Sequence, residues 1–174
     1  DGAIVNNSAK TTTGAWSFAD FYSYVCRMIG QNGRRGALMI SMNVNHPDIE
    51  KFIEMKHDLT KVTGANVSVK ITDDFMMAVK NDEDYTLHWT SKDGTKSVER
   101  TVRAKDIWNK IVNSATKTAE PGILMWDNIT KNLPAHEYEG FKTRTTNPCG
   151  RFASMLDAAH GGQPCPRQAR LKQT

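Results

Sequence analysis

The chain has 174 residues, of which 39% are hydrophobic and 24% are charged. This is the composition of an ordinary globular domain that is large enough to bury a core. No apolar run approaches the roughly 18 residues of a membrane helix, and the first ten residues lack a signal-peptide h-region. These features argue against membrane and secreted proteins, and we expect a cytoplasmic one.

The net charge of +4 is unevenly distributed along the chain. Residues 151–174 carry four basic side chains against the single acidic Asp157, so the first 150 residues are almost neutral and have no basic stripe. This distribution argues against a nucleic-acid partner. The three cysteines are odd in number and widely spaced, which fits neither a disulfide framework nor a zinc site and indicates a reducing compartment.

The first predicted element is a helix over residues 16–29, where apolar side chains recur at three- and four-residue steps. Ser17 and Asp20 resemble a capping box, and Gly30 suits the C-terminal cap. Cys26 lies on the apolar stripe of this helix, and we therefore interpret it as a core thiol.

Short strands and helices alternate after this helix. The apolar run 37–42 predicts a buried strand, and Pro47 opens a second helix, HPDIEKFIEMK. Residues 66–71 alternate as a strand, and Thr72 caps the short helix DDFMMAVK.

The rest of the first 130 residues continues this pattern. Residues 85–90 and 98–102 are β-rich and flank a turn at Asp93-Gly94, which predicts a hairpin. A third long helix is expected over 105–118, and Pro121-Gly122 leads from it into the strand ILMW. Helices alternating with short apolar strands indicate an α/β architecture with parallel strands, of barrel or doubly wound type.

Two loops could carry chemistry. In QNGRRG, residues 31–36, two glycines bracket two arginines that could bind phosphates or nucleobases, although a turn with solvated arginines has the same composition. In NPCG, Pro148 and Gly150 hold Cys149 at a loop tip, two residues after Asn147. A reactive thiol and an incidental one are both compatible with this loop. The five histidines have no metal-ligand spacing.

The order of five segments gives a more specific indication. WSFADFYSYV, GQNGRRGALMISMNVNHPDIEKFIEMK, VTGANVSVKITDDFMMAV, AEPGILMWDNITKN and TTNPCG together resemble the catalytic (large) subunit of ribonucleotide reductase over residues 1–150. The similarity is closest to the adenosylcobalamin-dependent, class II type. It implies a fragment of the ten-stranded α/β barrel of that family, in which a finger loop presents a cysteine in the motif N-x-C-x-E.

The resemblance also implies residue roles. Cys149 matches the cysteine that becomes a thiyl radical and removes the ribose 3′ hydrogen, and Asn147 matches the asparagine that holds the substrate hydroxyls. Two further segments match binding regions of the family: the substrate pocket, at Thr13, Gly14 and Ala15, and the deoxynucleotide effector loop, at Gln31, Asn32, Gly33, Arg34, Arg35 and Gly36.

Cofactor and partners follow from the same resemblance. The radical generator would be adenosylcobalamin in the parent enzyme, or alternatively a radical-generating small subunit, and we expect the fragment alone to bind neither. The implied partners are a ribonucleotide substrate, a deoxynucleotide effector, the remaining barrel segments and a second copy in a homodimer. Neither nucleic acid nor a membrane is expected.

The chain departs from the family pattern at residue 151. The motif's glutamate, the acid/base group for the 3′ hydroxyl, is replaced by Arg151, which cannot accept a proton at neutral pH. Residues 151–174 look unrelated or frameshifted, with one turn of helix at 152–159, and Cys165 is not assigned a redox role. We therefore expect domain 1–150 to be a partial reductase barrel that is inactive alone. The alternative is a non-catalytic nucleotide-binding or subunit-interaction module.

Overall fold

The computed structural model describes residues 11–29, 36–91, 94–131, 133–134, 138–140, 142–148 and 153–154. Gly30, Asp93, Cys149 and most of the segment 31–36 therefore lie outside the described residues. The chain divides into two compact units, Asp1–Asn132 and Leu133–Thr174. Each unit is described by itself.

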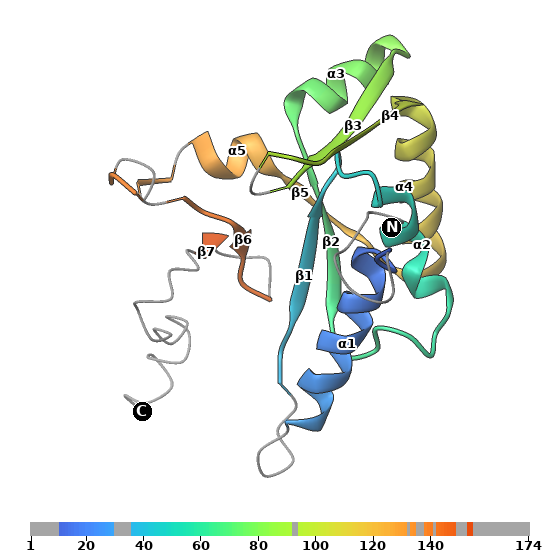
Figure 1. Ribbon diagram of the computed structural model, residues 1–174, viewed down its shortest axis with the longest axis vertical. Coiled ribbons are helices and arrows are strands. Elements are labelled where there is room, and N and C mark those ends of the chain that lie inside the picture. Colours follow the sequence, from blue (N-terminus) through green and yellow to red (C-terminus); the bar gives the residue numbers. More distant parts are fainter. Residues whose placement is uncertain are drawn as a thin grey trace. The chain divides into compact units, whose positions relative to one another are not determined.

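The first unit is built on a parallel sheet of three strands. Its strands are β1 (Met39–Asn43), β2 (Asn66–Ile71) and β5 (Gly122–Met125), in the order β1-β2-β5 (Figure 1). Val67, Val69 and Ile71 of the central strand are buried, because parallel strands are joined by helical crossovers that cover the sheet. The parallel α/β arrangement predicted from the sequence is confirmed.

Helices cover one face of this sheet. Figure 1 shows α1 (Ala15–Met28), α2 (Ile49–Glu54) and α4 (Ala104–Thr118) on the same side, with the short 3₁₀ helix η1 (Met55–His57) following α2. Their apolar side chains meet those of the sheet in one cluster, which includes Ala19, Phe52, Ile53, Ile107 and Ile111. Burial of each large side chain in this cluster stabilises the fold by about 1.5–3 kcal/mol.

A hairpin and two shorter helices complete the first unit. Helix α3 (Asp73–Asn81) precedes the antiparallel strands β3 (Asp84–Thr90) and β4 (Ser97–Arg103), and α5 (Trp126–Lys131) follows β5. The hairpin was predicted correctly. The predicted strand ILMW (123–126) lies one residue too far along the chain, because β5 begins at Gly122 and Trp126 already begins α5, a helix that was not predicted.

Of two predicted helix caps, one is wrong and the other is right only in its position. The capping box at Ser17 does not form, because α1 begins at Ala15 and the Asp20 carboxylate instead accepts the N–H of Val62 at 2.9 Å. Thr72 stands at the N-cap of α3, but its side chain makes no capping hydrogen bond. The N–H of Asp73 instead donates to a carboxylate oxygen of Asp127 at 2.7 Å, so the cap comes from α5.

Cys26 is half-buried rather than a fully buried core thiol. The buried face of α1 is centred on Ala19 and Ser23 instead. Four aromatic side chains of the same helix are more than half exposed: Phe18, Phe21, Tyr22 and Tyr24.

The loop before β2 is docked on α1. Ser23 Oγ accepts the N–H of Gly64 at 2.8 Å, one turn beyond the bond between Asp20 and Val62. A Cβ atom on Gly64 would lie 2.6 Å from Arg27 Cγ and 2.7 Å from the Ser23 carbonyl oxygen. Only glycine therefore lets the loop approach the helix backbone this closely.

Replacing Gly64 by alanine is expected to reduce the free energy of unfolding by about 1–3 kcal/mol, because the added methyl group must displace backbone atoms of α1. Urea unfolding measures the change. Thr63→Ala is the matched control, since Thr63 is exposed in the same loop and should change stability little. Equal stability of the Gly64→Ala variant and the native chain would mean that the loop is not fixed on α1.

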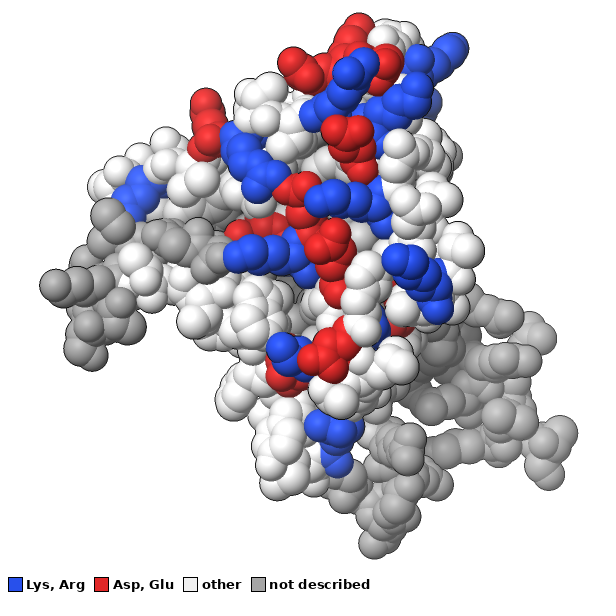
Figure 2. Space-filling model, turned by 90° about the vertical axis from the view of Figure 1, so that its right-hand side faces the viewer, with Lys and Arg blue, Asp and Glu red and all other residues white. Residues whose placement is uncertain are grey.

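The helical face carries both signs of charge. Figure 2 shows Lys and Arg side chains interspersed with Asp and Glu on this side of the molecule. Glu50 of α2 pairs with Arg100 of β4 and, at 2.6 Å, with Lys110 of α4. These half-exposed pairs tie three elements together, although each contributes little to stability by itself.

The second unit contains one short antiparallel pair, β6 (Thr145–Thr146) and β7 (Ala153–Ser154). The turn of helix predicted over 152–159 is wrong at Ala153 and Ser154, which lie in a strand. A two-residue strand is too short to show the alternation of apolar and polar residues that identifies strands in a sequence.

Candidate functional site

The segment Thr13–Ala15, expected to contact substrate, forms the start of α1. Gly14 stands at the N-cap with a φ angle of 91°, a conformation that favours glycine. Thr13 Oγ1 and Ser17 Oγ lie 2.6 Å apart, and Ser17 Oγ donates to the Gly14 carbonyl oxygen at 2.9 Å. The first turn of the helix is thereby held by short-range hydroxyl contacts.

A carboxylate from another element holds the same helix end. The N–H of Ala15 donates to Asp48 Oδ2 at 3.1 Å, and Asp48 is buried in the turn between β1 and α2. A negative charge at the N-terminus of a helix is favourable because the helix dipole is positive there. Asp48 was not among the predicted site residues, although an aspartate soon after a strand end is a common signal for a cap or a site.

The turn that carries Asp48 is fixed on the sheet. The N–H of Val44 donates to the Lys70 carbonyl oxygen at 3.0 Å, and the N–H of His88 donates to the Asn45 carbonyl oxygen at 2.7 Å. The N–H of Asp48 donates to His46 Nδ1 at 3.0 Å. Strands β2 and β3 therefore position the turn, and the turn positions the start of α1.

His46 makes the stability of this turn dependent on pH. Burial lowers the pKa of His46 below its ordinary value of 6.5, and Nδ1 must be unprotonated to accept the Asp48 N–H. Because the folded-state pKa is depressed, the stabilisation is complete above about pH 6.5 and is lost as pH falls through the folded-state value.

We expect His46→Asn to flatten the dependence of Tm on pH between neutrality and about pH 5. An asparagine oxygen can accept the same i+2 N–H in an Asx turn but does not titrate in this range. Thermal melts in phosphate-free buffers, with His57→Asn as the control, measure the effect. An unchanged pH dependence in His46→Asn would show that His46 is not the titrating group.

Gly36 packs near the other end of α1. A Cβ atom placed on Gly36 would lie 2.8 Å from Cys26 Sγ, so the backbone there approaches the last turns of the helix. Gly14 and Cys26 are 12 residues apart in sequence, which in an α-helix is roughly 18 Å. The structure therefore connects the predicted substrate segment to the end of the predicted effector segment through one helix, and it does not bring the two together.

The two residues predicted to be catalytic, Asn147 and Cys149, fall in the second unit. Asn147 is half-buried and directly follows β6, whereas Cys149 and residues 31–35 lie outside the described residues.

Within the described ranges, no three His, Cys, Asp or Glu side chains gather to hold a metal ion. No helix in the part that the structure describes is long and apolar enough to cross a membrane.

Comparisons with known proteins place the chain in a family. The profile of the family described as "Ribonucleotide reductase, barrel domain" matches residues 1–159. A vitamin B12-dependent ribonucleoside-diphosphate reductase of Thermoplasma acidophilum is 36% identical over 149 residues, which cover 84% of this chain and 19% of that protein. A putative ribonucleoside-diphosphate reductase large subunit of Frog virus 3 is 34% identical over 124 residues, or 68% of this chain and 21% of that protein.

A third relative, a vitamin B12-dependent ribonucleoside-diphosphate reductase of Mycobacterium tuberculosis, is 29% identical over 151 residues, or 86% of this chain. The chain spans about a fifth of the length of these relatives. The parallel α/β fold of the first unit agrees with a portion of an α/β barrel. Because the family profile covers residues 1–159 of 174, the chain belongs to the ribonucleotide reductase barrel-domain family.

Proposed function

We propose that this chain is a part of a ribonucleotide reductase catalytic subunit, an oxidoreductase that converts ribonucleotides into deoxyribonucleotides for DNA replication. The observation that carries the proposal is the family match over residues 1–159. The vitamin B12-dependent relatives support a class II parent. We propose a domain boundary after Gly150, where the composition of the chain changes. The family match extends nine residues beyond this boundary, to residue 159.

In this proposal Cys149 carries the chemistry. As a thiyl radical its sulfur takes the ribose 3′ hydrogen atom, forming an S–H bond and leaving the unpaired electron on the 3′ carbon. Asn147 lies two residues earlier and directly follows a strand, which would fix the backbone from which its amide reaches the substrate hydroxyls. The NPCG turn supports this role because Pro148 stiffens the approach to the thiol and Gly150 permits a tight turn after it.

The start of α1 would contact the sugar rather than the phosphates of a substrate. The Asp48 carboxylate already accepts the Ala15 N–H, and a second negative charge at this helix end would be repelled. The Thr13 side chain is exposed and can donate or accept a hydrogen bond with a ribose hydroxyl. We therefore propose that Thr13, Gly14 and Ala15 line the ribose side of the substrate pocket.

The segment 31–36 would bind a deoxynucleotide effector for allosteric control. Arg34 and Arg35 supply guanidinium groups for phosphate oxygens, and the glycines permit close backbone approach. The exposed aromatic face of the preceding helix α1, with Phe21 and Tyr22, supports a homodimer at this site. Sedimentation velocity with and without effector tests that association.

Adenosylcobalamin would act from outside this chain. The two cavities described in the first unit measure about 500 and 380 Å³, the size of sites for small ligands, and a corrinoid is larger than either. Neither cavity is therefore proposed as its site. In the parent, we propose that other barrel segments hold adenosylcobalamin, or that a radical-generating small subunit replaces it.

Arg151 favours the second candidate function for the isolated chain, which is nucleotide binding without catalysis. Purified chain with ribonucleotide, reductant and adenosylcobalamin should form no deoxynucleotide, while a full-length relative does so under the same conditions. Calorimetry should detect deoxynucleotide binding that is lost in Arg34→Ala/Arg35→Ala and retained in the exposed-surface control Lys80→Ala. Turnover by the isolated chain would refute the proposal of inactivity, and absence of binding would refute the effector assignment.

A further inference from the structure

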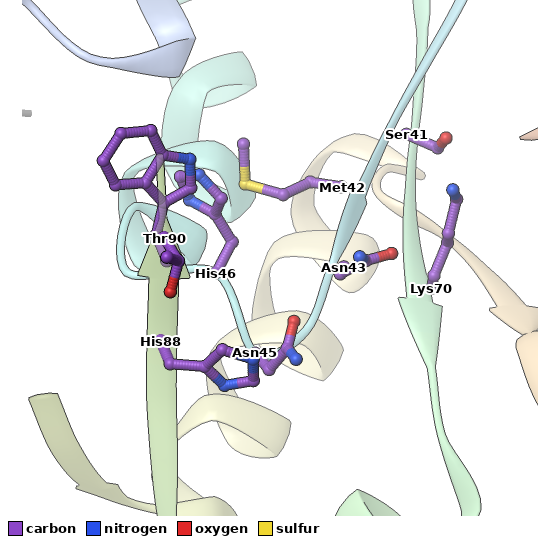
Figure 3. Close-up of a pocket in the computed structure, with 9 residues that line it drawn as sticks. Ser41, Met42, Asn43, Asn45, His46, Lys70, His88 and Thr90 are labelled. Carbon is purple, nitrogen blue, oxygen red and sulfur yellow. The ribbon is translucent and has the colours of Figure 1, made fainter. Parts of the chain in front are cut away.

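A cavity of about 500 Å³ lies where strands β1 and β2 end, next to the end of β3. It is lined by the last residues of β1, by the turn that carries His46, by Lys70 of β2 and by the end of β3 (Figure 3). In open α/β sheets, ligands bind at the carboxyl ends of parallel strands, and cavities of this volume suit small molecules. None of the roles proposed above uses this cavity.

Among the described residues, the lining is rich in hydrogen-bond donors and includes no carboxylate. Lys70 contributes an ammonium group, His46 and His88 contribute imidazoles, and Asn43 and Asn45 contribute carboxamides. Figure 3 shows Ser41, Asn43 and Lys70 on one side of β1, with the Asn43 side chain directed toward that of Lys70. This combination is electropositive and suits an anionic ligand.

Lys70 contributes the ammonium group of the cavity lining. Its amino nitrogen lies 4.2 Å from the ring centroid of Trp126, and this cation–π contact restricts the side chain. Burial lowers the pKa of Lys70, because the charged form is partly removed from water. An anion bound beside the ammonium group would offset that desolvation and raise the pKa again, which provides a direct spectroscopic readout.

We propose that this cavity binds a phosphate group. The donors come from three strands and from a turn, so several of them could reach one ligand from different directions. A tetrahedral oxyanion with four oxygen atoms can accept from several of these directions at once, whereas a carboxylate presents two oxygens in one plane. The phosphate can belong to an inorganic ion or to a nucleotide, and the experiment separates these sources.

Calorimetry of the full chain with inorganic phosphate, pyrophosphate and a nucleoside diphosphate tests the proposal. Lys70→Met keeps an apolar stem beside Trp126 but removes the charge, and it should weaken binding about 10–100-fold. Asn43→Asp, a same-shaped variant at an exposed position, should weaken binding by repelling the anion. Lys80→Met, in the last turn of α3, is the matched control and should bind like the native chain. NMR should show the pKa of Lys70 rising when phosphate is added.

Each result bears on the proposal. Binding of inorganic phosphate that depends on Lys70 and Asn43 supports a free-ion site, and dependence seen only with the nucleoside diphosphate supports a nucleotide as the source. Lack of binding by all three ligands, or binding that neither variant weakens, overturns the proposal. Nucleotide binding that is lost in Arg34→Ala/Arg35→Ala but unaffected in Lys70→Met would belong to the effector segment alone.

Discussion

Restoring a carboxylate at position 151 is expected to raise ribonucleotide reduction by about 10²–10⁴-fold in a full-length reductase that carries this chain's segment. The host is the Thermoplasma acidophilum relative, with its matching segment replaced by residues 1–159 of this chain. In the chimaera that keeps Arg151, this side chain cannot take the proton of the 3′ hydroxyl. The Arg151→Glu substitution supplies a general base of the kind the family motif uses. Deoxynucleotide formation measures the gain.

Arg151→Gln is the control for this substitution. Glutamine has the shape of glutamate and removes the guanidinium group, but it does not accept a proton, so the rate should stay near that of the Arg151 chimaera. Equal rates for the Glu and Gln variants would contradict an acid/base role at this position. Any gain in rate would then come only from removal of the bulky guanidinium group.

Replacing Phe75 by alanine is expected to lower the free energy of unfolding by about 3–5 kcal/mol. The Phe75 side chain is fully buried at 0% exposure, and its ring meets that of Tyr85 edge-to-face at a centroid distance of 5.1 Å. The substitution removes this aromatic pair and leaves a cavity between α3 and the hairpin. Urea unfolding followed by circular dichroism measures the loss.

Met77→Ala provides the matched control for Phe75→Ala. Met77 lies on the same helix with 52% of its surface exposed, so its truncation should change stability by only a few tenths of a kcal/mol. A loss below about 1 kcal/mol for Phe75→Ala would show that α3 is not anchored through this ring.

Most of the fold could be predicted because its elements have strong periodicity. Residues 66–71 alternate in polarity, and the observed β2 has these same bounds. The third helix was predicted over 105–118, and α4 begins only one residue earlier. Helix α5 follows β5 directly, with no loop residue between them, so Trp126 was assigned to the preceding apolar strand.

The caps could not be predicted, because their partners are distant in sequence. The Asp73 N–H is capped by Asp127, which is 54 residues away, and Asp20 caps the loop at Val62, which is 42 residues away. Local capping rules pair residues within one turn and cannot find such contacts. The capping box at Ser17 failed for this reason, whereas Thr72 was placed correctly at the N-cap but its side chain does not make the capping hydrogen bond.

The same limit applies to the candidate site. Asp48 supports the start of α1 across 33 residues, and the cavity near Lys70 joins side chains from three strands and a turn. No spacing rule connects these residues before the sheet is formed. In contrast, Cys149 and Asn147 lie in one short loop, and their roles, which the family resemblance implies, remain predictions.

The most direct test of the central claim, that Cys149 is the radical site of a reductase barrel, is turnover of the Arg151→Glu chimaera with and without that thiol. Cys149→Ser should abolish deoxynucleotide formation, since a hydroxyl group cannot replace the thiyl. Cys26→Ser should retain it, because Cys26 is a half-buried thiol on α1 with no proposed part in the chemistry. Retained turnover in Cys149→Ser would contradict the account.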